Sequence, residues 1–144
     1  MHLSFALYRS EARSKLDEEL ILDILTESVH SNAREGITGF LHVDRNIFLQ
    51  YLEGPHGPLM RKLARIRKDR RHRKFLILAD GTIDERFFPG WDMGHLSSDL
   101  LPTDGLLGRK TWLGQPVDID PLPLIQAFAK HAGQLDRTDI TSVA

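Results

Sequence analysis

The stretch Ile47–Gly54, IFLQYLEG, predicts a strand that is buried on both faces and is therefore central in a sheet. Side chains alternate between the two faces of a strand, so Phe48, Gln50 and Leu52 share one face and their neighbours share the other. Both faces are apolar, which leaves Gln50 as the exception. A buried amide carries two donors and two acceptor lone pairs that need partners. Gln50 is therefore the first candidate functional residue.

The segments around this stretch alternate between strand and helix patterns. Apolar alternation and turn residues predict strands at residues 2–10, 37–44, 46–53, 74–82 and 86–94. Helical spacing predicts one helix from the N-cap Ser14 to about Arg34, and a second that begins at Pro58 after a loop at 54–58. Pro89 makes the last strand irregular or places it at an edge.

This order of elements predicts an α+β fold of the ferredoxin-like type, βαββαββ, with a five-stranded mixed sheet and two helices on one face. A further amphipathic helix is expected at residues 121–132. We expect the C-terminal helices to cover the other face of the sheet or to contact a partner chain. The predicted division is a domain at 1–97 and a helical extension at 98–144.

Length and composition limit the class of protein. A chain of 144 residues predicts one domain, and the lack of cysteine excludes a disulfide framework, a thiolate zinc site and a cysteine nucleophile. No segment approaches the roughly 20 apolar residues of a membrane span, and residues 1–10 do not resemble a signal peptide. We therefore expect a cytoplasmic protein that does not enter a membrane.

Charge is concentrated in residues 61–74, RKLARIRKDRRHRK, which hold nine Arg or Lys and one Asp. One interpretation is a nucleic-acid surface that contacts phosphates. No aromatic side chains are interleaved for base stacking, so a solvated helix face is favoured over that interpretation. A third interpretation is that one or two of these cations hold the phosphates of a ligand.

Signatures of catalysis are missing from the sequence. It has no GxSxG, P-loop or GxGxxG motif, and its seven histidines form neither an i, i+4 pair nor a carboxylate-rich ligand set. We therefore expect neither an enzyme nor a metal site.

A set of polar residues within apolar elements is the remaining candidate site. Ser28 and Asn32 follow Leu25 at helical spacing, so they lie on one face of the first helix. In a split βαβ fold the strands that carry Tyr8 and Gln50 are neighbours, and the first helix crosses the same sheet. Two amides, a hydroxyl and a phenol in one place suit a flat heteroaromatic ring with alternating donors and acceptors.

These residues belong to five blocks that resemble one known family. The blocks are LYRS at 7–10, NAREGITGFL at 32–41, FLQYLEG at 48–54, IRKDRRH at 66–72 and RFFPGWDMG at 86–94. In this order and spacing they resemble the BLUF domain, a blue-light sensor that uses FAD, over about residues 1–97. The remaining chain has the size of the C-terminal helices of the short, single-domain members.

The resemblance implies the roles of the central residues. Tyr8 is expected to donate an electron and a proton to the excited flavin. Gln50 is expected between Tyr8 and the N5/O4 edge of the flavin, and Asn32 at its O4/N3 edge.

More peripheral roles follow from the same resemblance. Arg71 and His72 are expected near the pyrimidine side of the flavin, and Arg65 near a phosphate. Trp91 and Met93 match the switch residues of the family's fifth strand. Ser31 differs from several relatives, which carry a second asparagine there.

The implied protein is a non-catalytic photoreceptor. Light is expected to rearrange hydrogen bonds at the flavin and to signal through the fifth strand and the C-terminal helices to an unidentified partner protein or within a homo-oligomer. FAD is the expected cofactor, with FMN or riboflavin as substitutes. A flavin-dependent redox enzyme and a nucleic-acid-binding domain that uses residues 61–74 remain as alternatives.

Overall fold

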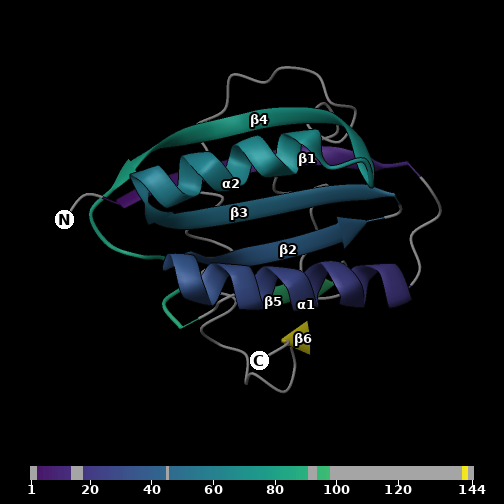
Figure 1. The fold of residues 1–144 in the computed structure, drawn as a ribbon, viewed down its shortest axis with the longest axis horizontal. Helices are drawn as coiled ribbons and strands as arrows, with labels where there is room; N and C mark the ends of the chain where they lie inside the picture. The colour runs from purple at the N-terminus through teal and green to yellow at the C-terminus, as the bar shows by residue number, and fades with distance from the viewer. Residues whose placement is uncertain (1–2, 14–17, 45, 91–93, 98–140, 143–144) are drawn as a thin grey trace.

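The computed structural model describes residues 3–13, 18–44, 46–90, 94–97 and 141–142. Its elements follow in the order β1 (Leu3–Ala12), α1 (Glu18–Glu35), β2 (Thr38–Asp44), β3 (Ile47–Pro55), α2 (His56–Lys68), β4 (His72–Ile83), β5 (Gly94–Ser97) and β6 (Thr141–Ser142). The two helices lie over the same face of the sheet, as Figure 1 shows. The predicted α+β class and the predicted order of the elements from β1 to β4 are confirmed.

The sheet has the strand order β4-β1-β3-β2-β5-β6. Strands β4, β1, β3 and β2 are antiparallel neighbours, whereas β5 runs parallel to β2 and β6 pairs with β5. The sheet is therefore mixed, as predicted, but across the described residues it has six strands rather than five, because residues 141–142 add one. The central position of β3, next to β1 and β2, agrees with its apolar sequence on both faces.

The face of the sheet under the helices holds the main core. This cluster contains Ala6, Tyr8, Ala12, Leu25, Val29, Ile37, Leu41, Phe48, Leu52, Leu59 and Leu63. The residues alternate along each strand, so the predicted division of β3 into two faces is confirmed. Gly36 ends α1 with a φ of 70°, and the Ile37 amide donates to the Asn32 carbonyl oxygen at 2.9 Å. This bond belongs to a Schellman motif, which needs a left-handed residue such as glycine after the helix.

The opposite face of the sheet holds a second group of buried rings. Phe40 stacks on Tyr51 with ring centroids 5.9 Å apart, and Phe88 packs against both at 5.1 and 5.3 Å. Glu53 is fully buried beside them. Its carboxylate accepts hydrogen bonds from the Thr38 and Tyr51 hydroxyls at 2.7 and 3.0 Å.

Glu53 also explains why residues 86–90 do not form the predicted strand. The amides of Phe87 and Phe88 donate to its two oxygens at 2.7 and 2.9 Å, so they are not paired with a neighbouring strand. Pro89 has no amide hydrogen, and Gly90 has a φ of 81°. The prediction of a strand over 86–94 is therefore wrong for residues 86–90, residues 91–93 lie outside the described part of the chain, and β5 comprises Gly94–Ser97.

Two further boundaries differ from the prediction. The expected loop at 54–58 is absent, because Gly54 and Pro55 continue β3 and pair with Ser4 and Leu3. A Cβ on Gly54 would lie 2.8 Å from the Gly36 carbonyl oxygen, so this close approach requires glycine. Helix α2 then begins at His56. The expected N-cap Ser14, the expected helix at 121–132 and nearly all of the expected 98–144 extension lie outside the described residues.

Strand β4 contains two β-bulges against β1. Tyr8 pairs with Ile77 but Leu7 pairs with Ala79, and Arg9 pairs with Leu76 but Glu11 pairs with Arg73. One extra β4 residue is inserted at each break in register. The second insertion contains Lys74, whose φ of 53° lies in the left-handed region that residues other than glycine rarely adopt.

Candidate functional site

A cavity of about 180 Å³ lies between α1, α2 and the sheet. Apolar side chains of both helices and of the sheet form part of its wall: Ile24, Leu41, Phe48 and Ile66. Polar and charged side chains form the rest: Tyr8, Glu27, Ser28, Ser31, Asn32, Gln50, Lys62, Arg65, Asp69, Arg71 and His72. The mixture of apolar walls and convergent polar groups is typical of a small-molecule site.

Tyr8 and Gln50 form a buried polar pair at the wall of this cavity. They are direct partners in the β1–β3 register, which confirms the prediction that their strands are neighbours. The Tyr8 hydroxyl donates a hydrogen bond to Gln50 Oε1, and both side chains are buried. Burial raises the pKa of the Tyr8 phenol well above its usual value, and the nearby Asp69 carboxylate raises it further. The phenol is therefore protonated at neutral pH.

Two rings of β4 pack against the Tyr8 ring. Phe75 packs against Tyr8 with centroids 4.7 Å apart and an interplanar angle of 33°. His72 approaches Tyr8 edge-on, with centroids 6.5 Å apart. Strand β1 lies between β4 and β3. The aromatic contacts of Tyr8 therefore come from β4, whereas Gln50 comes from β3 on the other side.

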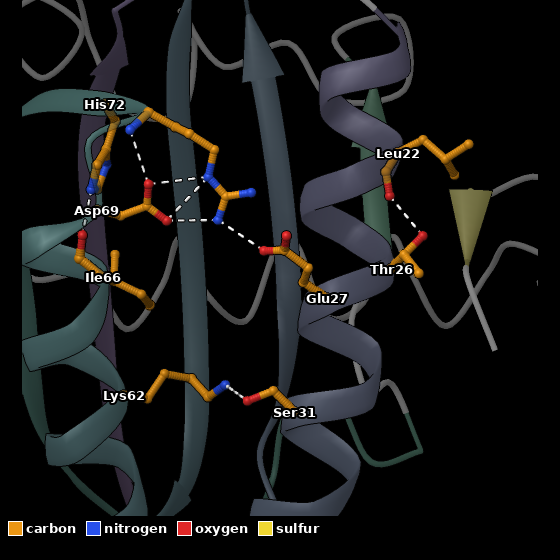
Figure 2. Close-up of polar contacts among 9 residues, drawn as sticks. Leu22, Thr26, Glu27, Ser31, Lys62, Ile66, Asp69 and His72 are labelled. Atoms are coloured by element: carbon orange, nitrogen blue, oxygen red, sulfur yellow. Dashed lines mark hydrogen bonds and ion pairs between the residues drawn. The ribbon is translucent and has the colours of Figure 1, made fainter.

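The hydrogen bonds of His72 define its tautomer. Its Nε2 lies 2.5 Å from the Ile66 carbonyl oxygen, and its Nδ1 lies 2.7 Å from Ser10 Oγ. A carbonyl oxygen only accepts, so Nε2 carries a hydrogen and donates it. In the neutral ring Nδ1 then accepts from the Ser10 hydroxyl. His72 therefore connects the end of α2 to β1 beside Tyr8, and Figure 2 shows its bond to Ile66.

Asn32 is placed in the cavity by the C-terminal turn of α1. Its side chain is only 1% exposed, and its backbone carbonyl is part of the Schellman motif that ends the helix. Leu25, Val29 and Asn32 form the buried side of α1. The predicted helical stripe is therefore confirmed, with Ser28 half-buried on the same side.

Charged side chains link the two helices across one end of the cavity. Lys62 of α2 donates to Ser31 Oγ of α1 at 2.5 Å, a contact drawn in Figure 2, and lies 3.6 Å from Glu35 Oε1. Arg65 binds the same Glu35 oxygen at 2.6 Å. Burial lowers the pKa of Lys62, an effect that the Glu35 carboxylate opposes. The pKa of Glu35 is itself lowered: burial raises it, but the Ser31 hydrogen bond and the two cations outweigh that effect.

A second link lies at the turn between α2 and β4. The Arg71 guanidinium binds Asp69 through Nε at 3.1 Å and Nη2 at 2.6 Å, and its Nη2 lies 2.9 Å from Glu27 of α1. Figure 2 shows the carboxylates of Asp69 and Glu27 at the two ends of this bridge. The hydrogen bonds to Arg71 lower the pKa of Asp69, and those to Asp69 raise the pKa of Arg71.

All the predicted binding residues in the described part of the chain line this one cavity: Tyr8, Ser28, Asn32, Gln50, Arg65, Arg71 and His72. Trp91 and Met93 lie outside the described residues. The cavity also holds three charged residues that were not predicted for the site, Lys62, Asp69 and Glu27. Of these residues, only Asp69 stands out in the sequence, because it is the single acid within the basic run 61–74 and could have been predicted to pair with a neighbouring cation.

Many cations of the basic run contact acidic side chains. Arg65 and Lys62 contact Glu35, Arg71 contacts Asp69 and Glu27, and Arg73 and Lys74 both lie within 4 Å of Glu11. These partners neutralise charge that a phosphate backbone would otherwise attract. The arrangement therefore does not favour a nucleic-acid surface. Across the described residues no helix is long and apolar enough to span a membrane, and no group of His, Asp or Glu could hold a metal ion.

The chain matches the family model described as "BLUF: Sensors of blue-light using FAD" over residues 3–94. It is 30% identical over 103 residues to the photoactivated adenylate cyclase subunit beta of Euglena gracilis. That match covers 70% of this chain and 12% of the cyclase subunit, so the chain spans only a small part of this relative. The alpha subunit of the same organism is also 30% identical, with 10% of its length covered.

Solved structures show the same fold. "BlrB - a BLUF protein, dark state structure" has a TM-score of 0.72 at 28% identity, and the match covers 93% of this chain and 98% of that one. The photo-activated state of BlsA has a TM-score of 0.72 at 28% identity, with 90% and 94% covered. Klebsiella pneumoniae BlrP1 with FMN and cyclic diGMP has a TM-score of 0.66 at 30% identity, and only 36% of that chain is covered.

Proposed function

Because the chain belongs to the BLUF family, the sensors of blue light that use FAD, we propose that it is a blue-light photoreceptor with Tyr8 and Gln50 as its photoactive pair. The hydrogen bond from the Tyr8 hydroxyl to Gln50 Oε1 at the wall of the cavity carries this proposal. FAD is the proposed cofactor, as in the family description. FMN and riboflavin are proposed substitutes, since a structure of BlrP1 is described with FMN.

The residues of the cavity fit a flavin. Apolar side chains such as Phe48 and Ile66 suit the faces and the methyl-bearing end of its ring system. The amides of Asn32 and Gln50 offer donors and acceptors to a ring edge that carries both. Arg65 lines the cavity and is more than half exposed, so it is the proposed contact for the phosphates of FMN or FAD, shared with its ion pair to Glu35.

Tyr8 is proposed as the donor of the electron and the proton. A bound flavin, once excited by blue light, supplies a strong oxidant. Burial keeps the Tyr8 phenol protonated in the dark, because it raises the pKa of that group. A phenol becomes strongly acidic when it loses an electron, and Gln50 Oε1 already accepts its hydrogen bond. Proton transfer therefore needs no movement of either side chain.

Gln50 is proposed as the switch because its amide carries both a donor and an acceptor. With Oε1 directed at Tyr8, its Nε2 is the group that can donate elsewhere. Rotation or tautomerisation of the amide after proton transfer exchanges these roles and changes the donors presented to the cavity. A changed donor pattern at the flavin O4 shifts its absorption to the red without a covalent bond.

The output is proposed to pass through the sheet to β5 and the chain beyond it. Gln50 lies on β3, β2 is its neighbour, and β5 pairs with β2. Trp91 and Met93, which precede β5, are proposed signalling residues, and residues 98–144 a proposed output or oligomer segment. We propose that the partner is a separate protein or a further copy of this chain.

The test is the absorption spectrum of the purified protein before and after blue light. We expect a yellow protein with a light-induced, thermally reversible red shift. The chain offers a matched pair of controls, because its two tyrosines are both buried. Tyr8→Phe should keep the flavin and lose the shift. Tyr51→Phe should keep both, because its hydroxyl bonds Glu53 on the opposite face at 3.0 Å.

Other outcomes would overturn the proposal. A colourless protein that takes up no flavin would remove it. A photocycle that survives Tyr8→Phe would reject the assigned donor. Steady turnover with a reductant, without a red shift, would indicate a flavin-dependent redox enzyme instead.

A further inference from the structure

We propose that Phe75 is a positioning residue for Tyr8 and that the β-bulge at Lys74 sets Phe75 in place. This inference rests on the proposed photochemical role of Tyr8. It concerns the β4 side of Tyr8, whereas Gln50 lies on β3, the neighbour of β1 on the other side.

The backbone observation is a change of face within β4. His72 and Phe75 are separated by an odd number of positions, so an unbroken strand would direct them to opposite faces. The register against β1 shifts between the Arg9–Leu76 pair and the Glu11–Arg73 pair, and Lys74 within this shift has a φ of 53°. The extra residue brings His72 and Phe75 to the same face.

The side-chain observation is a group of three rings on that face. Phe75 lies 4.7 Å from Tyr8 and 6.0 Å from His72, measured between centroids, and His72 lies 6.5 Å from Tyr8. The guanidinium carbon of Arg67 lies 5.1 Å from the centroid of Phe75. Phe75 is therefore held from α2 by a cation–π contact while it contacts the tyrosine.

These contacts restrict the rotation of the Tyr8 ring. Phe75 and His72 both pack against the ring, so its hydroxyl stays directed at Gln50 Oε1. Proton transfer depends steeply on the geometry of donor and acceptor, and a displacement of about 1 Å can cost 100-fold in rate. A looser ring would keep the same chemical groups but would transfer the proton less efficiently.

The charge of Lys74 does not explain why this residue would matter for the position of Phe75. Arg73 and Lys74 lie 3.6 and 3.7 Å from the Glu11 carboxylate, but both cations are more than half exposed, and such surface pairs contribute little. The left-handed backbone is the specific feature of Lys74. Glycine tolerates that conformation, whereas a β-branched residue does not.

The first test compares Phe75→Leu with Phe5→Leu in the flavin-loaded protein. Phe5 lies on the opposite face of β1, where its ring centroid is 6.0 Å from that of Tyr51. The loss of its ring therefore perturbs the core but leaves the surroundings of Tyr8 unchanged. We expect Phe75→Leu to lower the yield of the red-shifted state per absorbed photon by about tenfold and to lengthen the flavin fluorescence lifetime. Phe5→Leu should leave both quantities at the wild-type value. Equal values in the two variants would overturn the inference.

The second test separates backbone conformation from charge. Lys74→Gly and Lys74→Val both remove the Lys74 cation and leave Arg73 beside Glu11, but only glycine favours the left-handed conformation. We expect wild-type photochemistry for Lys74→Gly and a reduced yield for Lys74→Val. Wild-type yields in both would reject the role of the bulge. If Lys74→Val does not fold, the comparison of Phe75→Leu with Phe5→Leu still decides the role of Phe75.

The two proposals fail in different ways. A Tyr8→Phe protein that keeps its red shift would overturn the proposed function, and the role of Phe75 would fall with it. A Tyr8→Phe protein that loses the shift, together with a Phe75→Leu protein that matches wild type, would overturn only the positioning role.

Discussion

Tyr8 and Gln50 occupy directly opposite positions of the antiparallel β1–β3 pair, and the tyrosine hydroxyl donates to the glutamine Oε1. Directly opposite residues on one face have Cβ atoms about 5 Å apart, so the pair is held by the ladder itself rather than by a loop. Both residues lie on central strands. The contact therefore lies in the core of the sheet, which suits the proposed proton transfer within the short lifetime of an excited state.

Gln50→Leu should abolish the red shift while the fold and flavin binding persist. Leucine fills a similar volume among apolar neighbours, but it removes the acceptor of the Tyr8 hydrogen bond and the amide donor. The measurement is the light-minus-dark absorption spectrum, with flavin content as the control for binding. A normal red shift in a folded, loaded Gln50→Leu protein would show that the amide is not the switch.

Asn32→Ala should weaken flavin binding by about tenfold, as expected for the loss of a buried hydrogen bond to a ligand. Asn32 is 1% exposed and lines the cavity. The dissociation constant can be measured from the quenching of flavin fluorescence on titration with the apoprotein. The exposed His30→Ala on the same helix is the control and should bind like wild type. Equal flavin affinities of Asn32→Ala and His30→Ala would show that Asn32 does not hydrogen-bond the edge of the flavin ring.

Glu53→Gln should destabilise the protein by about 1–3 kcal/mol, because an amide NH₂ replaces one of two buried acceptor oxygens. The Phe87 and Phe88 amides, the Thr38 hydroxyl and the Tyr51 hydroxyl all donate to this carboxylate. Urea unfolding measures the loss. Amide hydrogen exchange should also accelerate at Phe87 or Phe88.

The exposed Asp84→Asn, close to the same segment in sequence, is the matched control for Glu53→Gln and should change neither quantity. Unchanged exchange at both phenylalanines in Glu53→Gln would mean that the carboxylate does not hold the segment before β5 to the sheet.

Asp69→Asn should make the free energy of unfolding fall less steeply as the pH is lowered into the acid range. The Arg71 contact lowers the pKa of Asp69 in the folded protein below its usual 3.8, so the unfolded chain binds more protons there. This carboxylate therefore stabilises the fold above about pH 4, and that stabilisation is lost as the pH falls through the folded pKa. Melting temperatures between pH 6 and pH 3 test this, with the exposed Asp80→Asn as the control. Parallel pH profiles for wild type and Asp69→Asn would refute it.

The sequence determines those features that depend on local pattern and on strand neighbours. The two apolar faces of β3 place it at the centre of the sheet, and the helical spacing of Leu25 and Asn32 places both on the buried side of α1. The contact of Tyr8 with Gln50 then follows from the βαβ topology. The predicted residues that line the cavity share this origin, because each lies in a regular element or directly next to one.

Other features depend on contacts between segments that are distant in the sequence. Lys62 of α2 binds Ser31 of α1, and Arg71, which follows α2, binds Glu27 of α1. No local pattern connects these partners in the sequence. The predicted strand at 86–94 fails for the same reason, since Glu53 on β3 captures the amides of Phe87 and Phe88. A charged residue at the end of a strand gives no local sign that it will accept four buried hydrogen bonds.

The amino-acid pattern by itself thus determined the α+β class, the order of elements up to β4, the central strands and the Tyr8, Gln50 and Asn32 set. Only the tertiary structure decided the bulges of β4, the aromatic contact of Phe75 with Tyr8 and the ion pairs across the cavity. The reason is physical. Periodicity records which side of an element is buried, whereas register shifts and charge partners are fixed by the packing of whole elements against one another.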